Sequence, residues 1–523
     1  MAKAVSGNQT RLAEVAGAFS MAGDLGRGQP LGHSLRTCYL SCHIAQELEL
    51  SAENKAEAYY AALLVHAGCT AGAPQFAAML AGDELAAMRD MYLCDPGNML
   101  QILRWIGRHV SPEASFPTRT QRFVQALLQA ERTMADFDRG CSDVGAQVAK
   151  RLGLPAGTQE SLFHICELWN GKGPHRLKGE SIPLATRIVN ASMVLEVFFT
   201  AEGKREAEAT AVRFRERYFD PEVVDAFLAV AKREDFWNGM GQEDPWDRVM
   251  AMEPGTSYRY VEEGDLDDVL TAFADFTDFK SAYTAGHSRE TARLAEAVAR
   301  RMQIGPAEVT LAKRAALAHD LGLVAMPSFL LDKPGPLSEL EQEQLKLHPY
   351  YTQLILSRVP ALQPVAAVAC MHHEWLNGQG YHRGLSQDSI PPAARVVAVA
   401  DAYVELIHGG PGRRGVGTEG ALSLVQQQVG TRFDQACFEA LATEVHSMNP
   451  KGSGGQEWPK DLTEREVDVL RLVSQGLSRR EVAQQLVVSE HTVRHHLESV
   501  YSKIGVSSRA GAVLFAVENG LLG

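Results

Sequence analysis

The sequence lacks the features that mark secreted and membrane proteins. Its 8 cysteines are spread over 523 residues without a Cys-x-x-Cys pair, which favours reduced thiols over a disulfide framework. The first residues lack the apolar segment of a secretory signal, and no uninterrupted apolar run reaches the roughly eighteen residues that span a bilayer. We therefore expect a cytoplasmic protein without membrane contact.

Positive charge is also scarce, because 51 Lys and Arg stand against 64 Asp and Glu, for a net charge of −13. A protein that coated nucleic acid along its whole surface would be basic, so any contact with DNA must be local. Alternating β-branched runs are few, whereas apolar residues recur at helical spacing through most of the chain. Because 45% of the residues are hydrophobic, we expect an all-α fold of two to four domains.

An internal repeat dominates the middle of the chain. The segment CELWNGKGPHR begins at Cys166, and HEWLNGQGYHR begins at His373. Each is followed by Ser-Ile-Pro and then by an arginine, at Arg187 and Arg395. Further matches pair His33 with His287, His66 with His319, Cys141 with His348, and Asp220 with Asp434. We therefore expect two copies of one helical domain.

The repeat and the local composition set the expected domain boundaries. The first copy covers residues 20–236 and carries roughly forty-five extra residues, which we place at about 75–130. A connecting segment at 237–279 leads to the second copy at 280–448. The stretch NPKGSGG from Asn449 is dense in flexible and turn-forming residues, so 449–459 is the expected linker to a separate domain at 460–523.

The second copy carries polar residues at intervals within otherwise apolar helices. One buried histidine is ordinarily a hydrogen-bonded helix residue, but several His and Asp together are costly to bury without a shared partner. Imidazoles and carboxylates suit Fe, Mn or Zn, and two such cations need about six or seven donors. A water held between two cations becomes a hydroxide near neutral pH, which is the nucleophile that opens a phosphodiester. The expected ligands are His287, His319, Asp320, His348, His372, His373 and Asp401.

Several of these motifs resemble the HD-GYP branch of the HD-domain phosphohydrolases over about residues 280–445. The resemblance rests on His319-Asp320, Lys333-Pro334-Gly335, His348-Pro349, and His372-His373-Glu374 through Gly378-Gln379-Gly380-Tyr381. It implies an all-helical fold with a centre of two or three divalent metals that hydrolyses cyclic dinucleotides or related phosphoesters.

The second copy also departs from the family pattern at several positions, including the stretch from His408 to Arg414, where the family usually has Arg-Pro-Tyr-Arg. His382 replaces the proline of the GYP signature, and Leu323 replaces a lysine after His-Asp. Tyr283 stands where three-metal members have a glutamate, which favours two ions. Lys333 and Arg383 remain as candidate phosphate-binding residues in place of the missing lysine.

The first copy lacks both aspartates of the ligand set, because Ala67 matches Asp320 and Met193 matches Asp401. Two cations cannot be charge-balanced there, so we expect no hydrolysis in this half. One interpretation is a degenerate duplicate kept for packing and dimer contacts. The alternative is a thiol and imidazole site for one zinc or for redox sensing, formed by His33, His66, Cys141 and Cys166.

The insertion in the first copy is apolar. It contains Met79, Met88, Met91 and Trp105. These residues either line a ligand pocket or form the apolar face of a helix, and the second interpretation is the simpler one.

The last sixty or so residues show three helix starts in close succession. Thr463 with Glu466 forms a capping box, Ser478 caps a second helix, and Ser489 caps a third after the short Val487-Val488 turn. Two helices joined by so short a turn are typical of a helix-turn-helix, whose second helix enters the major groove. Between residues 479 and 509, five Lys and Arg outnumber three Asp and Glu, which suits phosphate contacts.

This segment resembles the LuxR/NarL type of helix-turn-helix over about residues 460–523, through Leu-Thr-x-Arg-Glu, Ser-x-x-Glu-Val-Ala, Ser-x-x-Thr-Val-Arg-x-His and Lys-Ile-Gly-Val. The resemblance implies a four-helix module that dimerises through its last helix, about 508–520, and binds a two-fold operator in double-stranded DNA. The DNA-contacting residues that it implies are Arg480, Thr492, Arg494, His496 and Lys503.

Together these features indicate a homodimeric transcription regulator, with three alternatives for the helical halves. In the first, the metal-binding domain senses a nucleotide or other phosphorylated ligand. In the second, it is an active phosphodiesterase coupled to transcription. In the third, both copies are a ligand-free dimerisation scaffold.

Overall fold

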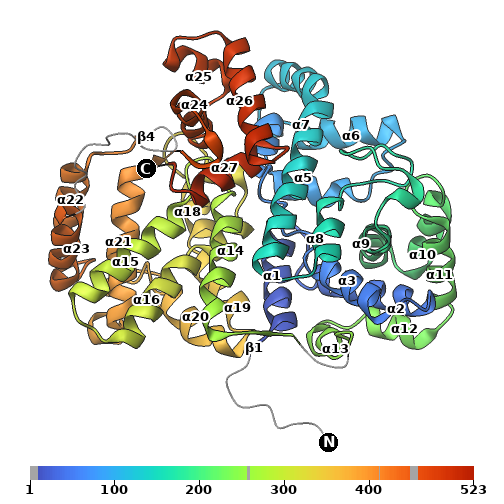
Figure 1. Ribbon diagram of the computed structural model, residues 1–523, viewed down its shortest axis with the longest axis horizontal. Coiled ribbons are helices and arrows are strands. Elements are labelled where there is room, and N and C mark those ends of the chain that lie inside the picture. The colour runs from blue at the N-terminus through green and yellow to red at the C-terminus, as the bar shows by residue number, and fades with distance from the viewer. Residues whose placement is uncertain (1–9, 256–258, 411–412, 448–457, 523) are drawn as a thin grey trace, which may run out of the picture. The chain divides into compact units, whose positions relative to one another are not determined.

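The computed structural model of the chain describes residues 10–255, 259–410, 413–447 and 458–522 (Figure 1). Helices form nearly all of the regular structure, which confirms the all-α prediction. Within those ranges the strands are two short antiparallel pairs, β1 (Thr10–Arg11) with β2 (Tyr260–Val261) and β3 (Gly409–Gly410) with β4 (Arg413–Arg414). The predicted linker at 449–459 lies mostly outside the described residues.

The chain divides into two compact units, Met1–Val269 and Leu270–Gly523. The helices of the first unit are α1 (Leu12–Gly26), α2 (His33–Glu47), α3 (Ala52–Leu63), α4 (Ala73–Leu80), α5 (Glu84–Met91), α6 (Met99–His109), α7 (Phe116–Arg151), α8 (Ala156–Phe163), η1 (Gly179–Ser181), α9 (Leu184–Glu202), α10 (Lys204–Phe214), α11 (Pro221–Val230), α12 (Glu234–Met240), α13 (Trp246–Ala251) and η2 (Glu263–Asp265). Helix α14 (Leu266–Asp278) crosses the boundary between the units, and the expected connecting segment at 237–279 contains the end of α12 and the whole of α13, β2, η2 and α14.

Helix α9 belongs to the core of the first unit, where it packs against α2, α3 and α10. It is long and apolar enough to cross a membrane by composition alone, but 56% of its most apolar window is buried inside the protein. Arg187 and Glu196 interrupt its apolar residues and form ion pairs within this unit. These are the properties of a core helix, because an apolar helix surrounded by other helices needs no lipid.

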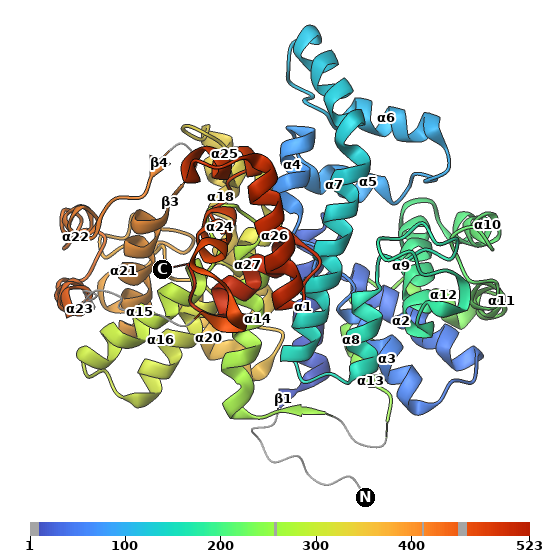
Figure 2. The same cartoon turned by 45° about the horizontal axis from the view of Figure 1, so that its top comes forward.

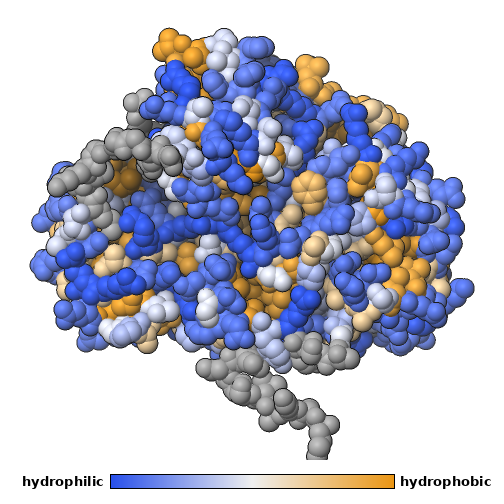
Figure 3. Space-filling view, in the orientation of Figure 1, coloured by the Kyte–Doolittle hydropathy of each residue, from blue (hydrophilic) through white to orange (hydrophobic). Residues whose placement is uncertain are grey.

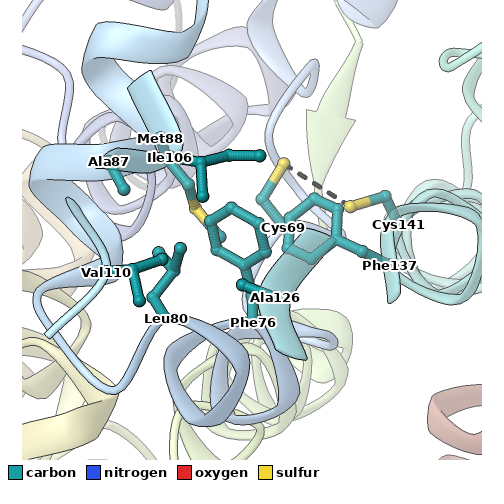
Figure 4. Close-up of a cluster of buried hydrophobic side chains, with 10 residues drawn as sticks. All are labelled: Cys69, Phe76, Leu80, Ala87, Met88, Ile106, Val110, Ala126, Phe137 and Cys141. Carbon is teal, nitrogen blue, oxygen red and sulfur yellow. Dashed lines mark hydrogen bonds between the residues drawn. The ribbon is translucent and has the colours of Figure 1, made fainter. Parts of the chain in front are cut away.

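The predicted insertion forms α4, α5, α6 and the first part of α7. Figure 2 shows α6 and the beginning of α7 projecting from the rest of their unit. Some of its apolar side chains pack inwards: Met88 and Phe76 are 1% exposed, and Trp105 packs against the same cluster while its indole N–H donates to the carbonyl oxygen of Ala87 over 2.9 Å. Figure 4 shows the resulting cluster, which Phe137 of α7 closes on one side. The apolar-face interpretation therefore accounts for these residues.

The second unit contains a helical domain and the C-terminal segment. Its elements after α14 are α15 (His287–Arg301), α16 (Pro306–Ala318), η3 (Leu321–Ala325), α17 (Ser328–Leu331), α18 (Glu339–Leu345), α19 (His348–Leu356), η4 (Pro360–Leu362), α20 (Gln363–Ala369), η5 (Gln387–Ser389), α21 (Pro392–His408), α22 (Thr418–Gln426), α23 (Gln435–Ser447), η6 (Pro459–Asp461), α24 (Glu464–Ser474), α25 (Arg479–Leu486), α26 (Glu490–Ile504) and α27 (Arg509–Glu518). Helices α15, α16 and α21 pack against one another at the centre of the domain.

The two halves share contacts that neither composition nor helix content requires. Helices α2 and α15 both begin at a histidine preceded by a glycine with a positive φ, 87° at Gly32 and 79° at Gly286. The next residue, a serine, donates from its backbone N–H and its hydroxyl to a buried aspartate, Asp24 or Asp278. These matched contacts are what a duplicated domain predicts.

An arginine also pairs with an aspartate in both halves, Arg187 with Asp220 over 2.5 Å and Arg395 with Asp434 over 2.9 Å. Each aspartate follows a short stretch in which the backbone forms an isolated parallel bridge, between residues 215 and 219 or between residues 429 and 433. The arginine near the start of α9 and the arginine near the start of α21 therefore bind the corresponding turn of their own half.

The surface is mainly hydrophilic on the face drawn in Figure 3, where hydrophobic residues appear as separate patches. Among the described residues, the large hydrophobic side chains most exposed to solvent include Phe116 at 84%, Leu128 at 81% and Val487 at 89%. Phe116 and Leu128 belong to α7, and Val487 lies in the turn between α25 and α26.

Candidate metal centre and DNA-binding domain

The seven predicted metal ligands come from the ends of helices and from the middle of α21. His287 is the first residue of α15, His319 caps α16 with Asp320 next to it, and His348 is the first residue of α19. His372 and His373 follow α20, and Asp401 lies within α21. Helix ends from distant parts of the sequence thus meet at one point.

Three of these residues form the first group of ligand atoms. The Nε2 atom of His287 lies 3.1 Å from Oδ1 of Asp401, and Nε2 of His319 lies 3.3 Å from the same oxygen. The ligand atoms that His287, His319 and Asp401 offer all lie within 4.8 Å of one another, and the three residues are buried. This spacing suits a single cation.

The second group lies on the other side of Asp320. His348, His372 and His373 bring their ligand atoms within 4.8 Å of one another. Oδ1 of Asp320 is 3.5 Å from Nε2 of both His348 and His372, whereas Oδ2 is 3.3 Å from Nε2 of His319. The carboxylate of Asp320 therefore points one oxygen at each group, which is the geometry of a bridging ligand.

The tautomers of three histidines are fixed by hydrogen bonds to the carbonyl left free at the end of a helix. The Nδ1–H of His319 donates to Ala316 over 2.8 Å, and that of His372 donates to Ala369 over the same distance. The Nδ1–H of His348 donates to Leu345 over 2.7 Å. Each ring thus directs Nε2 towards the centre, as metal-ligating histidines with a backbone partner do.

The Nε2 atoms of His348 and His372 face each other, and both need a partner that accepts a lone pair. Nε2 of His348 lies 3.1 Å from Nε2 of His372, while the other nitrogen of each ring already donates to a carbonyl. Burial lowers the pKa of His348 to about 4, so its ring is neutral at pH 7. A divalent cation satisfies both lone pairs, since neutral imidazole is the metal-binding form.

The acidic residues of the centre stay ionised despite their burial. Burial raises the pKa of Asp320, but the charge of His319 outweighs this effect and holds the pKa well below its usual range. Burial also raises the pKa of Asp401, and hydrogen bonds from His287 and His319 hold it well below its usual range. Two buried carboxylates in the charged form fit a site for two divalent cations.

A cavity of about 510 Å³ adjoins this centre. Asp320 contributes to its wall, together with Leu323, Tyr283 and Lys333. Its size falls within the range of about 300–1,000 Å³ that is typical of small-molecule sites. Arg383 does not belong to this lining among the described residues, and Lys333 donates to both carboxylate oxygens of Glu341 over 2.7 Å.

Backbone contacts around Gly68 and Gly322 show which residues of the two halves occupy equivalent positions. A Cβ atom on Gly68 would meet the carbonyl oxygen of Cys141, and one on Gly322 would meet that of His348. The Cys69 N–H donates to the carbonyl of His66 over 3.0 Å, as the Leu323 N–H donates to that of Asp320 over 2.8 Å.

These backbone contacts place His66 opposite Asp320, whereas the sequence comparison matched His66 with His319 and Ala67 with Asp320. The correction puts Val65 opposite His319 and Cys69 opposite Leu323. Matching the two histidines shifted the alignment by one residue, because it took no account of the glycine that must approach a carbonyl closely.

The four residues of the predicted thiol and imidazole site have other partners in the structure. The ring of His33 pairs with the carboxylate of Glu196, which also accepts from Arg36. His66 stacks on His33 at 5.3 Å between ring centroids, and its Nδ1 atom lies 3.6 Å from the sulfur of Cys69.

Cys141 lies 3.8 Å from Cys69, sulfur to sulfur, and next to Cys166. Within the described residues, His33, His66, Cys141 and Cys166 do not gather their ligand atoms within 4.8 Å, as the groups in the second half do. Sequence reasoning missed Cys69, whose only signal was its place three residues after His66.

The C-terminal segment forms the predicted helices with the predicted caps. The hydroxyl of Thr463 accepts from the N–H of Glu466, whose carboxylate returns the contact, and Ser478 and Glu481 form a second capping box. Ser489 caps α26 by accepting from the Thr492 N–H over 3.0 Å. Val487, with a φ of 55°, makes the turn between α25 and α26.

Of the predicted DNA-contacting residues, Arg480 lies on α25 and the other four lie on α26. Arg480 and Arg494 are exposed, whereas Thr492 and His496 are half-buried. Arg494 donates to Glu498, one turn further along α26, over 2.7 Å.

Lys503 has contacts of its own inside the domain. Its ammonium group donates to Glu466 over 2.7 Å and to the carbonyl oxygen of Asp461 over 2.9 Å. The structure therefore engages Lys503 in holding α26 to the start of α24.

Comparison with known proteins agrees with both parts of the chain. Residues 273–437 match the family "HD domain", and residues 460–516 match "Bacterial regulatory proteins, luxR family". The 3'3'-cGAMP-specific phosphodiesterase 3 of Vibrio cholerae is 30% identical over 445 residues, which cover 85% of this chain and 96% of that protein. The cyclic di-GMP phosphodiesterase response regulator RpfG of Xanthomonas campestris is 34% identical over 187 residues, 35% of this chain and 49% of that protein.

A solved structure shows the same fold over most of the chain. It is a crystal structure of a cyclic GMP-AMP specific phosphodiesterase of Vibrio cholerae, with a TM-score of 0.57 and 28% identity, covering 85% of this chain and 99% of that one. The chain belongs to the family of HD-domain phosphodiesterases of the HD-GYP type. It joins such a domain to a C-terminal DNA-binding domain of the luxR family.

Proposed function

We propose that the second half is a metal-dependent phosphodiesterase for a cyclic dinucleotide and that the bound nucleotide controls the DNA-binding domain. The observation that carries this proposal is the position of Asp320. Its carboxylate lies between two groups of histidines and forms part of the wall of the adjoining cavity. Two ions held there would polarise a phosphoryl oxygen and acidify a water.

The residues of the chain have distinct roles in this proposal. His287, His319 and Asp401 hold one ion, and His348, His372 and His373 hold the other. The hydrogen bonds of Nδ1 to helix-end carbonyls keep the rings oriented before substrate arrives.

Lys333 supplies positive charge to the cavity wall next to the metals. It would exchange its contact with Glu341 for a phosphate oxygen when the nucleotide binds. The 3'3'-cGAMP-specific relative, which matches 85% of this chain, makes a cyclic GMP-AMP the first substrate to test.

The test is hydrolysis of cyclic GMP-AMP and cyclic di-GMP by the full chain, with Mn²⁺ or Fe²⁺ under reducing conditions. The variant His319→Ala/Asp320→Ala removes a ligand of the first group and the carboxylate that lies between the two groups, and it should reduce turnover on the order of 10³-fold or more. It should also lose its metals by elemental analysis. If neither the wild-type protein nor the variant hydrolyses either nucleotide, the enzyme proposal fails.

A second candidate function is sensing without turnover. Leu323, an apolar residue, lines the cavity where family members have a lysine, so one phosphate-binding charge is missing next to the metals. Ligand binding without hydrolysis would leave the nucleotide in place as an effector. Calorimetry that shows binding of the intact nucleotide, with no linear product released, favours this candidate over the enzyme.

DNA binding is tested at the exposed face of α26. Arg494→Ala should weaken operator binding by about 1–3 kcal/mol if the guanidinium reads a base edge. Glu498→Ala removes the intramolecular partner of Arg494 and should not weaken binding, so it is the matched control. Equal affinity of the Arg494→Ala variant and the wild-type protein at physiological salt contradicts this assignment.

The same proposal includes a homodimer, a cytoplasmic location and a duplicated origin of the two halves. Dimerisation through α27 would present two copies of α26 to a two-fold operator. The matched contacts of Ser34 with Asp24 and Ser288 with Asp278 support the duplication. Sedimentation analysis of the full chain tests the dimer.

A further inference from the structure

A second cluster of metal-ligand type lies in the first half and contains no thiol. His164, Glu167 and His175 each offer one ligand atom, and these atoms lie within 4.8 Å of one another. His164 caps the end of α8, and the other two residues belong to the loop between α8 and η1. The centre described above is formed by the second half and includes none of these residues.

Two imidazole nitrogens of this cluster lack a hydrogen-bond partner among the described residues. Nδ1 of His164 and Nε2 of His175 are inaccessible to solvent and have no hydrogen-bond partner. A buried nitrogen without a partner costs about 1–3 kcal/mol, so such atoms call for an ion or a water that satisfies them. Two of them beside a buried carboxylate favour a cation.

The arrangement of the rings is fixed by neighbouring residues. Phe163 stacks on His175 at 4.6 Å between centroids and contacts the edge of His164 at 5.0 Å. The two histidine rings are nearly perpendicular, with centroids 5.3 Å apart. Burial lowers the pKa of His164, and the neighbouring His175 lowers it further, so this ring is neutral and its lone pair is free.

The carboxylate of Glu167 accepts hydrogen bonds from the loop that precedes η1 and still has lone pairs for another partner. Its two carboxylate oxygens accept from the N–H groups of His175 over 2.6 Å and Leu177 over 2.9 Å, and the residue is 1% exposed. Each carboxylate oxygen has a second lone pair, which no hydrogen bond in the described residues uses. The backbone contacts also bring His175 back towards His164 along the chain.

We propose that His164, Glu167 and His175 bind one divalent cation of the zinc type, with an open fourth position that water fills. Two imidazoles and one carboxylate are a donor set that zinc accepts, with ligand atoms about 2.0–2.2 Å from the ion. Ligands around such an ion lie about 3–4 Å apart, so small side-chain rotations close the observed spacing. The ion joins the end of α8 to the loop that precedes η1.

The second half contains a natural comparison for this site. Glu374 accepts from two backbone N–H groups over 2.7 Å, as Glu167 does, and His382 stands opposite His175. Met371, however, stands opposite His164. The loop geometry is therefore shared, and only the first half has the complete set of donors.

The experiment measures zinc in the full-length variant His319→Ala/Asp320→Ala/His348→Ala/His372→Ala, which removes ligands from both histidine groups of the second half. After chelation and dialysis against Zn²⁺, we expect one ion per chain by elemental analysis. His164→Met, which copies the residue of the second half, should remove that ion, and so should His175→Ala. His382→Ala is the matched control and should retain it.

Substitution with Co²⁺ separates this site from the thiol cluster. A site of two histidines and a glutamate gives visible d–d bands without the sulfur-to-cobalt charge transfer that Cys69 or Cys141 would produce. Circular dichroism checks that each variant is folded. Absence of bound zinc in the starting variant, or its retention in both His164→Met and His175→Ala, overturns the proposal. The outcome is independent of whether the second half hydrolyses a nucleotide.

Discussion

The two halves place a buried histidine at the start of the same helix but neutralise it in different ways. In the second half, His287 faces Asp401 in a buried group of ligand atoms that could hold a metal ion. In the first half, His33 faces Glu196, and Arg36 completes that ion pair from within the chain. A half that supplies its own cations has no need of a metal at that position.

The buried arginine of the first half extends this contrast. The Arg27 guanidinium lies 5.1 Å from the ring centroids of both Tyr92 and Phe137, close to the thiols of Cys69 and Cys141. In the second half, Ser281 stands at the matched position, next to the open cavity. The same fold thus has a group of potential metal ligands beside a cavity in the second half, and buried arginines and ion pairs at the corresponding place in the first half.

Exchanging the residues that distinguish the halves should give the largest effect. Asp401→Met places the methionine of the first half in α21 and removes a ligand of the first metal group. We expect loss of about one metal ion per chain and a fall in phosphodiesterase activity on the order of 10²-fold or more.

The reciprocal change is the control. Met193→Asp, made in the His319→Ala/Asp320→Ala protein, should create no activity, because the first half has no histidines at the positions that match His319, His348, His372 and His373. Unchanged metal content in Asp401→Met would break the proposed contrast.

Coupling to DNA should depend on the second half alone. We expect the cyclic nucleotide to change operator affinity by about 5- to 150-fold in the wild-type protein. The variant His319→Ala/Asp320→Ala should lose this response, whereas Cys141→Ser in the first half should keep it. Fluorescence anisotropy of a labelled operator measures both. If Cys141→Ser abolishes the response, the first half and not the second half alone takes part in sensing the nucleotide.

The shared arginine–aspartate pair should stabilise both halves, but unequally. The side chains of Arg187 and Asp220 are 14% and 2% exposed, whereas those of Arg395 and Asp434 are both 21% exposed. Removing one partner of a more buried pair costs more, so we expect Arg187→Ala to lower the free energy of unfolding by about 2–3 kcal/mol and Arg395→Ala by about 1 kcal/mol. Urea unfolding measures both values, and the reverse order would contradict this explanation.

The smallest expected effect is a pH dependence confined to the first half. Burial raises the pKa of Glu196, but His33 outweighs it and holds the pKa below the ordinary 4.5, so this stabilisation disappears as pH falls below 4.5. Burial lowers the pKa of His33, but Glu196 raises it above the ordinary 6.5, so its stabilisation disappears as pH rises beyond 6.5.

The contribution of the His33–Glu196 pair to the free energy of unfolding is therefore greatest between pH 4.5 and pH 6.5. Glu196→Gln should flatten the profile of unfolding free energy against pH by about 1 kcal/mol. Glu202→Gln, an exposed change on the same helix, should leave it unaltered. A profile that Glu196→Gln does not change would show that the pair contributes no pH-dependent stability.

The sequence alone determined the all-α class, the presence of an HD-type domain and the caps of the C-terminal helices. Capping depends on residues three apart, such as Thr463 and Glu466, so local sequence is sufficient for it. The seven ligands were predicted as a set because polar residues within apolar helices stand out. Which oxygen of Asp320 faces which histidine group depends on the packing of α16, α19 and α21, and no local pattern encodes it.

Only the tertiary structure decided what the first half does with its centre. Glu196 and Arg36 are ordinary charged residues in the sequence, and the fold brings both of them next to the buried His33. The same holds for His66, which backbone contacts place opposite Asp320. Neither result follows from sequence spacing, because burial and close backbone approach decide which charges must be neutralised and which residues share a position.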